Sequence, residues 1–419
     1  MHQNITIMKH FLISISLLLL LAACHKNEDS VNPLPKGQRT VVVYMSGDNT
    51  LSSITRSDLQ ELVNGAKDKL SSSDRLVVFV DRISSVEKPF IARITGNSNQ
   101  PVDTLYKYSS DFQASNPDNF VEVLSRVTKL CPANEYGLVL WGHATGWCIQ
   151  EDMTRNASSR HAYGIDNGNK DSSGNYGLWL NIPDMRTCFE RLGIKWKFIF
   201  ADCCNMMCIE VGYEIRNWAE YLIGSPAEIP GWGAPYDQMA TILFSQSDTF
   251  YEDIINTYAD EYPDYLPLSA MRLSEMEQLA AATRQVMPAI AEHLHQGDAA
   301  ATRGIIYYNS PGGRTDQVNK SMYDMNDMIR TALDDSAYKV WHEAFQKAVP
   351  VCVTSSMWET NGSNTVNFND FIVTDAKMGC VSMFFPLDKY ENSKSVYHLN
   401  TDIRLFQWYD AVGWSSVGY

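Results

Sequence analysis

Two apolar segments of the sequence each lead into a side chain that could take part in nucleophilic catalysis. The run GLVLW ends two residues before His143, and the run WKFIFA is followed at once by Asp202, Cys203 and Cys204. A thiol nucleophile needs a base within hydrogen-bond reach, and a histidine can accept the thiol proton and later return it to a leaving group. These residue types therefore indicate cysteine-dependent acyl transfer.

Both apolar runs are typical of buried strands in a parallel sheet, and a helical pattern over residues 182–192 separates them. A strand–helix–strand unit of this kind makes its two strands parallel and commonly adjacent. Because the carboxyl ends of parallel strands meet at one edge, we expect His143 and the cysteine pair to lie close together. A helix predicted from about Met206 would point its N-terminus at the cysteines and lower the pKa of a thiol there.

The composition limits the other classes of function. The chain has 419 residues, of which 45% are hydrophobic and 20% charged, and its formal net charge is −15. This apolar fraction excludes a disordered tail protein. No dense basic stripe occurs, so we expect no nucleic-acid partner. Nine cysteines in 419 residues are too few for a fold held together by disulfides. We expect the protein to be a monomer.

The first residues are typical of an export signal. Residues 11–23 are uncharged, and this run is shorter than the roughly 20 residues that span a bilayer. The sequence LAAC, ending at Cys24, resembles the site at which bacterial lipoproteins are cleaved and lipidated. We therefore expect a signal peptide over 1–23 and a polar tether over 24–38, the alternative being an ordinary signal peptide with a chance cysteine. The acidic body suggests attachment to the membrane through lipid alone.

The two strand-end motifs resemble those of the clostripain family of cysteine peptidases, in the caspase-like clan. Residues 141–147 (WGHATGW) match its Trp-x-His pattern with a following Gly-Trp, and residues 202–206 (DCCNM) with Glu210 match its Asp-x-Cys pattern. The register of that match selects Cys204 as nucleophile and His143 as its base. The likeness extends from about residue 40 to the end. The acidic segment after Cys24, residues 26–29 (KNED), resembles the surface-export tethers of Bacteroidetes lipoproteins. That resemblance implies a lipoprotein at the outer membrane or cell surface of a Gram-negative bacterium.

The expected fold is an α/β/α sandwich of the caspase-like type, with a mostly parallel central sheet and a helix-rich C-terminal extension. Strand-like runs and helical patterns alternate through the first part of the chain, as at 40–45, 52–67, 75–80, 116–130 and 221–224. After about residue 260 the regular alternation of strands and helices gives way to long helical patterns with only short strand-like runs. We therefore divide the body into a peptidase core over 39–261 and an extension over 262–419 that packs on the core.

The resemblance also implies roles for the residues around the dyad. Backbone amides near Gly142, Ala144 and Cys204 would stabilise the oxyanion. The family often has aspartate and glycine where this chain has Gly142 and Ala144. The family places the aspartate that corresponds to Asp202 in the S1 pocket, and Glu228 is the nearest candidate for a second acid, which implies cleavage after arginine or lysine.

The polar stretch 144–176 is a candidate site of self-processing, since family members are commonly cleaved between the histidine and cysteine motifs. Arg155, Arg160 and Lys170 are the basic positions that such an enzyme would recognise. No metal site is predicted, because the other cysteines lack metal-ligand spacing and we interpret them as packing residues. The resemblance leaves calcium open, although no EF-hand spacing occurs.

The sequence thus predicts an exported, lipid-anchored cysteine endopeptidase with protein or peptide substrates and no required cofactor. Two alternatives remain at this stage. Gly142 and Ala144 are compatible with a catalytically inactive relative that binds protein or glycan through the same cleft. The second alternative is a related peptidase that prefers a non-basic P1 residue.

Overall fold

The computed structural model describes residues 32–83, 85–111, 113–148, 162–167, 178–309, 320–360, 364–367, 371–392 and 399–419. The proposed lipidation site Cys24 lies outside these residues, as do the processing candidates Arg155, Arg160 and Lys170. Within the described segments, no helix has the length and apolar character needed to cross a membrane.

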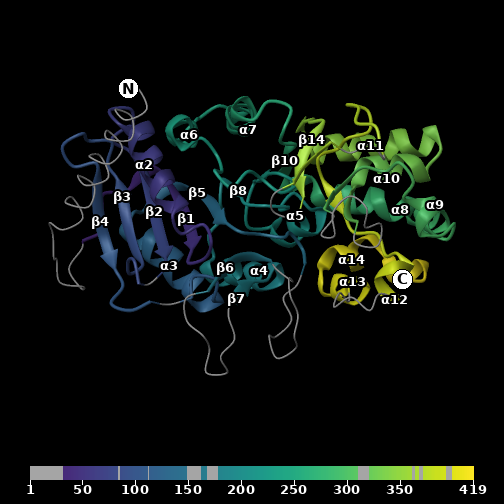
Figure 1. Cartoon of the computed structure of the whole chain (residues 1–419), viewed down its shortest axis with the longest axis horizontal. Helices are drawn as coiled ribbons and strands as arrows, with labels where there is room; N and C mark the ends of the chain where they lie inside the picture. The colour runs from purple at the N-terminus through teal and green to yellow at the C-terminus, as the bar shows by residue number, and fades with distance from the viewer. Residues whose placement is uncertain are drawn as a thin grey trace.

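A nine-stranded sheet runs through the protein in the order β13-β10-β9-β8-β5-β1-β2-β3-β4 (Figure 1). The parallel strands at its centre are β1 (Gly37–Gly47), β2 (Asp74–Arg82), β5 (Ala133–Gly142), β8 (Phe198–Asp202) and β9 (Tyr221–Gly224). An antiparallel pair extends each side, β3 (Phe90–Ile94) with β4 (Val102–Lys107), and β10 (Leu268–Arg272) with β13 (Val351–Val353). The predicted mostly parallel sheet is confirmed.

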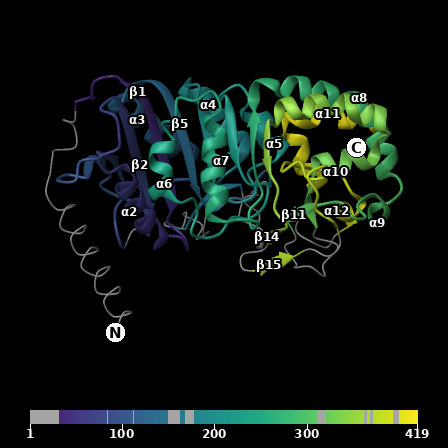
Figure 2. The same ribbon diagram turned by 90° about the horizontal axis from the view of Figure 1, so that it is seen from above.

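Helices cover both faces of this sheet (Figures 1 and 2). One face carries α2 (Ile54–Ala66), α6 (Tyr236–Ile242) and α7 (Phe250–Glu261), and the other carries α3 (Pro117–Leu130), α4 (Ile182–Leu192) and α5 (Ile209–Ile215). Alternate residues of one strand enter the two resulting cores, since Val41 and Val43 belong to one and Val42 and Tyr44 to the other. This two-sided burial explains why the central strands are continuous apolar runs, and it confirms the predicted α/β/α sandwich.

Local signals set the ends of the helices that connect the strands. Asn116 caps α3 with its side-chain oxygen, which accepts bonds from the amides of Asp118 and Asn119, and Pro117 occupies the first turn. Helix α4 ends at Gly193, which adopts a φ of 62°. The crossover from β5 to β8 passes through the short pair β6 (Tyr163–Asp166) and β7 (Leu178–Leu180) before it reaches α4.

The C-terminal part is rich in helices, as predicted. Its helical elements are η1 (Leu273–Glu275), α8 (Met276–Leu294), α9 (Asp298–Ala301), α10 (Met325–Ala332), α11 (Asp335–Ala348), α12 (Asp388–Asn392), α13 (Leu399–Asp402), η2 (Ile403–Leu405), α14 (Gln407–Val412) and η3 (Trp414–Val417). Strands β11 (Tyr307–Asn309), β12 (Ser321–Asp324) and β16 (Ser382–Met383) form a small sheet, and β14 (Met357–Thr360) pairs with β15 (Asn364–Asn367). The same part supplies β10 and β13, so strands from both sides of residue 262 share the central sheet.

The helix expected from Met206 is shorter and begins later, at Ile209. Asn205 has a φ of 58°. The following residues Met206 and Met207 are not helical, and both backbone groups of Met207 are bonded to distant residues. Its amide donates to the Ser225 carbonyl at 3.1 Å, and its carbonyl accepts from the Ser382 amide at 2.9 Å. These backbone bonds to distant segments override the local helical pattern.

Two cysteines that we interpreted as separate packing residues form a disulfide instead. Cys352 in β13 is bonded to Cys380, which precedes β16, and their Cα atoms are 5.7 Å apart. The loop that this bond closes contains the β14–β15 hairpin. The spacing of the two residues gave no indication of pairing, because the contact depends on how β13 joins the edge of the sheet.

Candidate active site

The ends of β5 and β8 bring the two motifs together. Trp141 and Asp202 are register partners in the parallel pair, so His143 and Cys204 each follow two residues beyond the last paired position. The indole N–H of Trp141 donates to Asp58 Oδ2 at 2.6 Å, which fixes the end of β5 against α2. The structure therefore places the predicted histidine and cysteine at one edge of the sheet.

Gly146 shows how closely the histidine and cysteine loops approach each other. A Cβ atom at this position would lie 2.5 Å from the Asn205 carbonyl oxygen and 2.7 Å from the Cys208 Sγ, and the φ of Gly146 is 63°. Both the close contact and the backbone conformation require glycine. The following Trp147 is fully buried and packs edge-on against Phe384, with ring centroids 4.8 Å apart.

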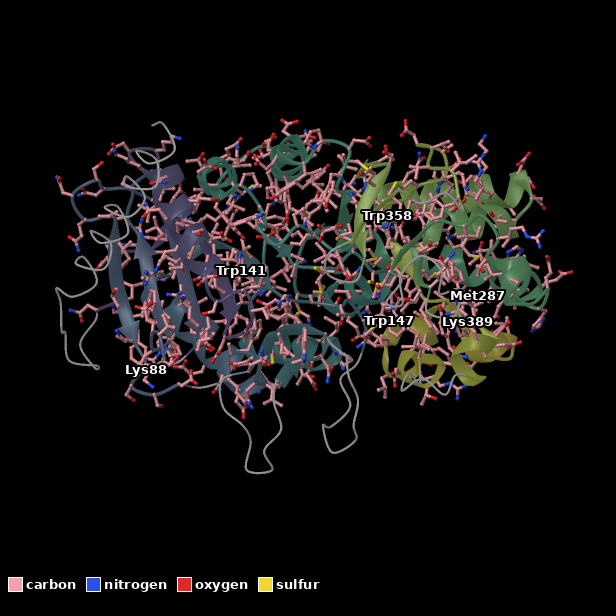
Figure 3. All side chains as sticks on the ribbon, viewed as in Figure 1. Lys88, Trp141, Trp147, Met287, Trp358 and Lys389 are labelled. Atoms are coloured by element: carbon pink, nitrogen blue, oxygen red, sulfur yellow. A yellow bond between two sulfur atoms is a disulfide. The ribbon has the colours of Figure 1, made fainter. Side chains whose placement is uncertain are left out.

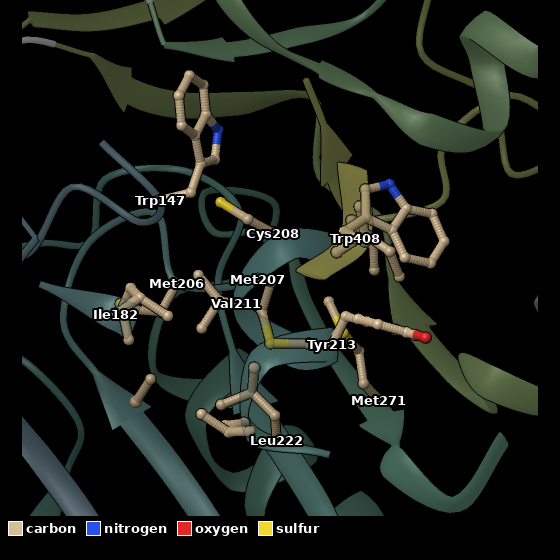
Figure 4. Close-up of a cluster of buried hydrophobic side chains, with 14 of the residues drawn as sticks. Trp147, Ile182, Met206, Met207, Cys208, Val211, Tyr213, Leu222, Met271 and Trp408 are labelled. Atoms are coloured by element: carbon tan, nitrogen blue, oxygen red, sulfur yellow. The ribbon is translucent and has the colours of Figure 1, made fainter. Parts of the chain in front are cut away.

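The apolar support of this junction surrounds α5, where Trp147, Met206, Met207, Cys208 and Trp408 gather (Figure 4). Trp147 and Trp358 both lie where the sheet meets the C-terminal helices (Figure 3). The motif residue Glu210 is also buried here, and its Oε1 accepts a bond from the Phe384 amide at 2.7 Å. Burial raises the pKa of Glu210 to about 8. The cysteine loop is thus held from the C-terminal part as well as from the sheet.

Gly142 departs from the family's common aspartate, and its backbone conformation explains why. Its φ is 146°, and a Cβ at this position would lie 2.9 Å from the Ser46 carbonyl oxygen in the neighbouring β1. An aspartate would be strained and crowded at this position. The imidazole therefore has no carboxylate partner from residue 142.

Thr50 contacts the imidazole instead, and the sequence analysis did not identify it. Its Oγ1 lies 2.8 Å from His143 Nε2. Thr50 follows β1, whose Ser46 pairs with Gly142 in β5, so the loop after β1 emerges beside the histidine. The available signal was that β1 ends at the same edge of the sheet, which brings its following loop to the site.

Ala144 is positioned so that its amide is directed away from the crossover segment. It faces Tyr163 in an isolated antiparallel bridge, with one hydrogen bond from Thr145 N to Ala162 O and another from Gly164 N to His143 O. Bonds that flank a facing pair leave the N–H of the central residue pointing outward. The alanine thus retains an amide that could serve an oxyanion.

Cys204 and Cys203 have different surroundings. Cys203 is fully buried, whereas part of Cys204 reaches the surface. The Cys204 Sγ accepts a bond of 3.4 Å from the Ile229 amide. The segment that contains Ile229 is fixed beside the cysteine, because Asn205 donates from its amide to Ala227 O and from its side chain to Pro226 O, both at 2.9 Å.

The resting site is not a thiolate–imidazolium pair, which corrects the effect expected from a helix at Met206. Burial of the thiol, with smaller effects of the Glu228 and Glu359 carboxylates, raises the pKa of Cys204 to about 12 against the opposing bond from Ile229. Helix α5 begins five residues after Cys204, too far for its N-terminus to stabilise thiolate. Burial also lowers the pKa of His143. Both groups are therefore neutral at neutral pH.

Asp202 is the last residue of β8, two positions before Cys204, and is almost fully buried, at 2% exposure. Its carboxylate accepts bonds from the hydroxyls of Tyr236 at 2.7 Å and Tyr258 at 2.9 Å, and from the Ala234 amide at 3.1 Å. Burial raises the pKa of Asp202, while these three donors oppose the shift. These bonds hold the segment after Gly233, together with Tyr258 of α7, against the end of β8.

Glu228 is half-buried and directly precedes Ile229, the residue whose amide reaches Cys204. It forms an isolated antiparallel bridge with Glu359 of β14. Sequence reasoning missed Glu359, because nothing in the pattern around it indicates that β14 returns to the cysteine loop. The two glutamates and Asp202 give the surroundings of Cys204 a negative potential.

The described part of the chain contains no group of three or more His, Cys, Asp or Glu side chains arranged to hold a metal ion.

Comparisons with known proteins agree with this geometry. The sequence model of the clostripain family matches residues 43–417. A secreted C11 cysteine protease from Bacteroides thetaiotaomicron, solved with an irreversible peptide inhibitor, is 26% identical, with a TM-score of 0.72 over 91% of this chain and 100% of that one. An inactive zymogen C11 protease from Parabacteroides distasonis is 22% identical, with a TM-score of 0.71 over 90% of this chain and 99% of that one. No protein with a curated description matches.

The resemblance inferred from the two motifs is confirmed by these matches, and the fold agrees with it over nearly the whole chain. The chain belongs to the clostripain family and is a cysteine peptidase.

Proposed function

We propose that this protein is an exported, lipid-anchored endopeptidase that cleaves peptide bonds after arginine or lysine, with Cys204 as nucleophile and His143 as general base and acid. The observation that carries the proposal is the pairing of Trp141 with Asp202 at the ends of β5 and β8. His143 follows Trp141 by two positions, and Cys204 follows Asp202 by two positions. The contact of Gly146 with Asn205 supports it, because the loops bearing the two side chains touch.

The proposed reaction starts from a neutral thiol and a neutral imidazole. As Sγ forms its bond to the scissile carbonyl carbon, the thiol proton moves to His143, and the carbonyl oxygen becomes an oxyanion bound by amides near Gly142, Ala144 and Cys204. Collapse of the tetrahedral species breaks the C–N bond, and His143 gives the proton to the leaving amine. Water then hydrolyses the thioester, with His143 as base, and releases Cys204.

Thr50 supports the role of the histidine. When Nε2–H donates to the Thr50 hydroxyl, Nδ1 is the nitrogen without a proton, and it can accept one from the thiol. A third group that orients the base is a general feature of activated nucleophiles. Thr50 would act here as a positioning residue.

The preference for a basic P1 residue is supported by the charges around the nucleophile. Glu228 directly precedes Ile229, whose amide contacts Cys204. Asp202 is buried at the end of β8, two positions before Cys204. The bonds that hold the Asp202 carboxylate leave Glu228 as the more accessible acid of the two. A cationic side chain next to the scissile bond would be attracted by both.

A panel of fluorogenic peptides that differ only at P1 tests this function on residues 25–419. We expect turnover of the arginine and lysine peptides, and loss of turnover in the Cys204→Ala and His143→Ala variants with unchanged circular dichroism. Absence of turnover across the whole panel, with an intact fold, would contradict the proposed activity. Efficient cleavage after neutral residues instead would contradict the proposed specificity alone.

Lipid attachment at Cys24 is supported by the apolar run and the small residues before it. The full-length protein should fractionate with membranes and run as a monomer in detergent. The Cys24→Ala variant should be released into the soluble fraction. Digestion of whole cells with an added protease tests exposure at the cell surface.

Self-processing between the two motifs is supported by the basic residues Arg155, Arg160 and Lys170 in that segment. Mass spectrometry of purified wild type beside Cys204→Ala tests it. We expect cleavage after one of these residues in the wild type alone. An uncut wild type would rule the process out.

A further inference from the structure

The C-terminal part supplies a second glutamate to the cysteine loop. Glu359 of β14 and Glu228 face each other in an isolated antiparallel bridge. Residues directly opposite in such a pair project to the same face, with Cβ atoms about 4.5–5.5 Å apart. The two carboxylates are therefore neighbours, although they come from opposite sides of the boundary near residue 262.

Glu359 is held in a defined position. The hydroxyl of Tyr265 donates to its Oε1 at 2.7 Å. The preceding Trp358 is fully buried, and its ring stacks on Phe371 at 5.7 Å and packs against Tyr308 at 5.5 Å. Since successive side chains of a strand point to opposite faces, burial of Trp358 in the C-terminal core directs Glu359 away from that core.

The bridge lies next to the nucleophile. Glu228 precedes Ile229, and the Ile229 amide donates to Cys204 Sγ at 3.4 Å. The pKa of Cys204, which burial raises most, is raised further by Glu228 and then by Glu359. Both glutamates thus act electrostatically on the reacting sulfur.

Two like charges directly opposite in a bridge are unfavourable on their own. A cation placed between the two carboxylates would relieve their repulsion and would be bound from both sides. The substrate can bring such a cation to this place.

We propose that Glu359 is a specificity-determining residue, which binds the cationic P1 side chain of the substrate together with Glu228. This inference rests on the proposed basic P1 preference and adds a residue that the two sequence motifs do not contain. It assigns to the β14–β15 hairpin a direct part in substrate recognition.

The test compares two peptides that are identical except for arginine or citrulline at P1, because citrulline has nearly the shape of arginine without its charge. In Glu359→Gln we expect kcat/KM for the arginine peptide to fall about tenfold or more, and that for citrulline to stay within about twofold. Glu343→Gln is the matched control, since Glu343 is an exposed glutamate of α11. The control should leave both values unchanged.

Two outcomes would overturn the inference. Equal losses on both peptides would assign Glu359 a structural role, and unchanged values on both would assign it none. Glu359→Asp should recover part of the preference for arginine, and Glu228→Gln with Glu359→Gln should lose less than the product of the single losses, because the two carboxylates share one cation.

A binding measurement separates this inference from the proposed function. Calorimetry on Cys204→Ala, with and without Glu359→Gln, measures affinity for the arginine and citrulline peptides without turnover. If the wild type cleaves neither peptide, the proposed activity fails, and binding still decides on Glu359. Equal affinity of Cys204→Ala for both peptides would refute the role of Glu359 directly.

Discussion

The hydroxyl oxygen of Thr50 lies 2.8 Å from Nε2 of His143, which connects the loop after β1 to the imidazole that follows β5. This contact occupies one ring nitrogen and leaves the other for proton exchange. It takes the place of a carboxylate at residue 142, where the φ of 146° and the nearby Ser46 carbonyl favour glycine.

Replacement of Thr50 by valine removes the hydroxyl and keeps the shape of the side chain. We expect kcat to fall about tenfold with little change in KM, which corresponds to the net contribution of about one hydrogen bond. Thr50→Ser should retain most of the activity, because it keeps the hydroxyl. Steady-state kinetics on an arginine peptide provides the measurement, and identical kcat values for the valine variant and the wild type would exclude the positioning role.

Gly146→Ala should damage both stability and activity. The new Cβ would press on the Asn205 carbonyl oxygen and Cys208 Sγ, and we expect a loss of about 1–3 kcal/mol in the free energy of unfolding. Gly193→Ala is the control, since its φ of 62° is similar and no heavy atom lies within 4 Å of its added Cβ. Urea unfolding of both variants isolates the contact, and equal losses would show that the backbone conformation alone is responsible.

Glu228→Gln should make Cys204 easier to ionise. The Glu228 carboxylate raises the pKa of this thiol after the larger effect of burial, so its removal lowers the pKa and increases the thiolate fraction at a given pH. Alkylation of Cys204 by iodoacetamide at pH 8 should become about three- to tenfold faster, as followed by mass spectrometry of its peptide. Glu343→Gln should not change the rate, and a slower reaction in Glu228→Gln would contradict the assignment.

Asp81→Asn should stabilise the protein at high pH. Asp81 is fully buried beside the carboxyl group of Asp166. Burial, followed by repulsion from Asp166, raises its pKa. Wild-type stability therefore falls as the pH rises above about 4, the ordinary value, until the raised pKa is passed.

The asparagine variant lacks this titration, so its advantage over the wild type should grow between pH 5 and pH 8 and reach about 1–3 kcal/mol. Urea unfolding at both pH values measures the difference. Asp248→Asn provides an exposed control. A constant difference between the two pH values would mean that Asp81 is already ionised at pH 5 in the folded protein, so that its pKa is not raised.

Loss of the Cys352–Cys380 disulfide should destabilise the C-terminal part. The bond spans 28 residues of sequence, and we expect the Cys352→Ser, Cys380→Ser double variant to lose about 3 kcal/mol of unfolding free energy. The preference for arginine over citrulline should weaken as well, because the closed loop contains Glu359. In the wild type, a reducing agent should lower the stability and weaken the preference for arginine in the same way, and it should not affect the variant. If the reduced wild type keeps both its stability and its preference, the disulfide does not support the C-terminal part.

The central strands and the two strand-end residues could be predicted because their signals are local. A strand buried on both faces is a continuous apolar run, as GLVLW before His143 and WKFIFA before Cys204 illustrate. The order of strand, helix and strand then limits their arrangement to a parallel pair. These two rules were sufficient to bring the histidine and the cysteine to one edge.

The rest of the site depends on contacts between distant parts of the chain. Met207 is not helical, because Ser225 and Ser382 bond its backbone, although the local sequence favours a helix. Glu359 reaches the cysteine loop through a bridge to Glu228, and the surrounding residues carry no mark of that pairing. Thr50 is a small polar residue in a loop, and only the end of β1 beside β5 gives it a role.

The cysteine loop is braced by residues that are synthesised long after it. The Ser382 amide bonds Met207, and the Phe384 amide bonds the buried Glu210. In a chain emerging from the ribosome, the loop after Cys204 therefore lacks these two bonds until Ser382 and Phe384 have also been made. The support of the cysteine loop is therefore set by the synthesis of Ser382 and Phe384, well after that of Cys204 itself.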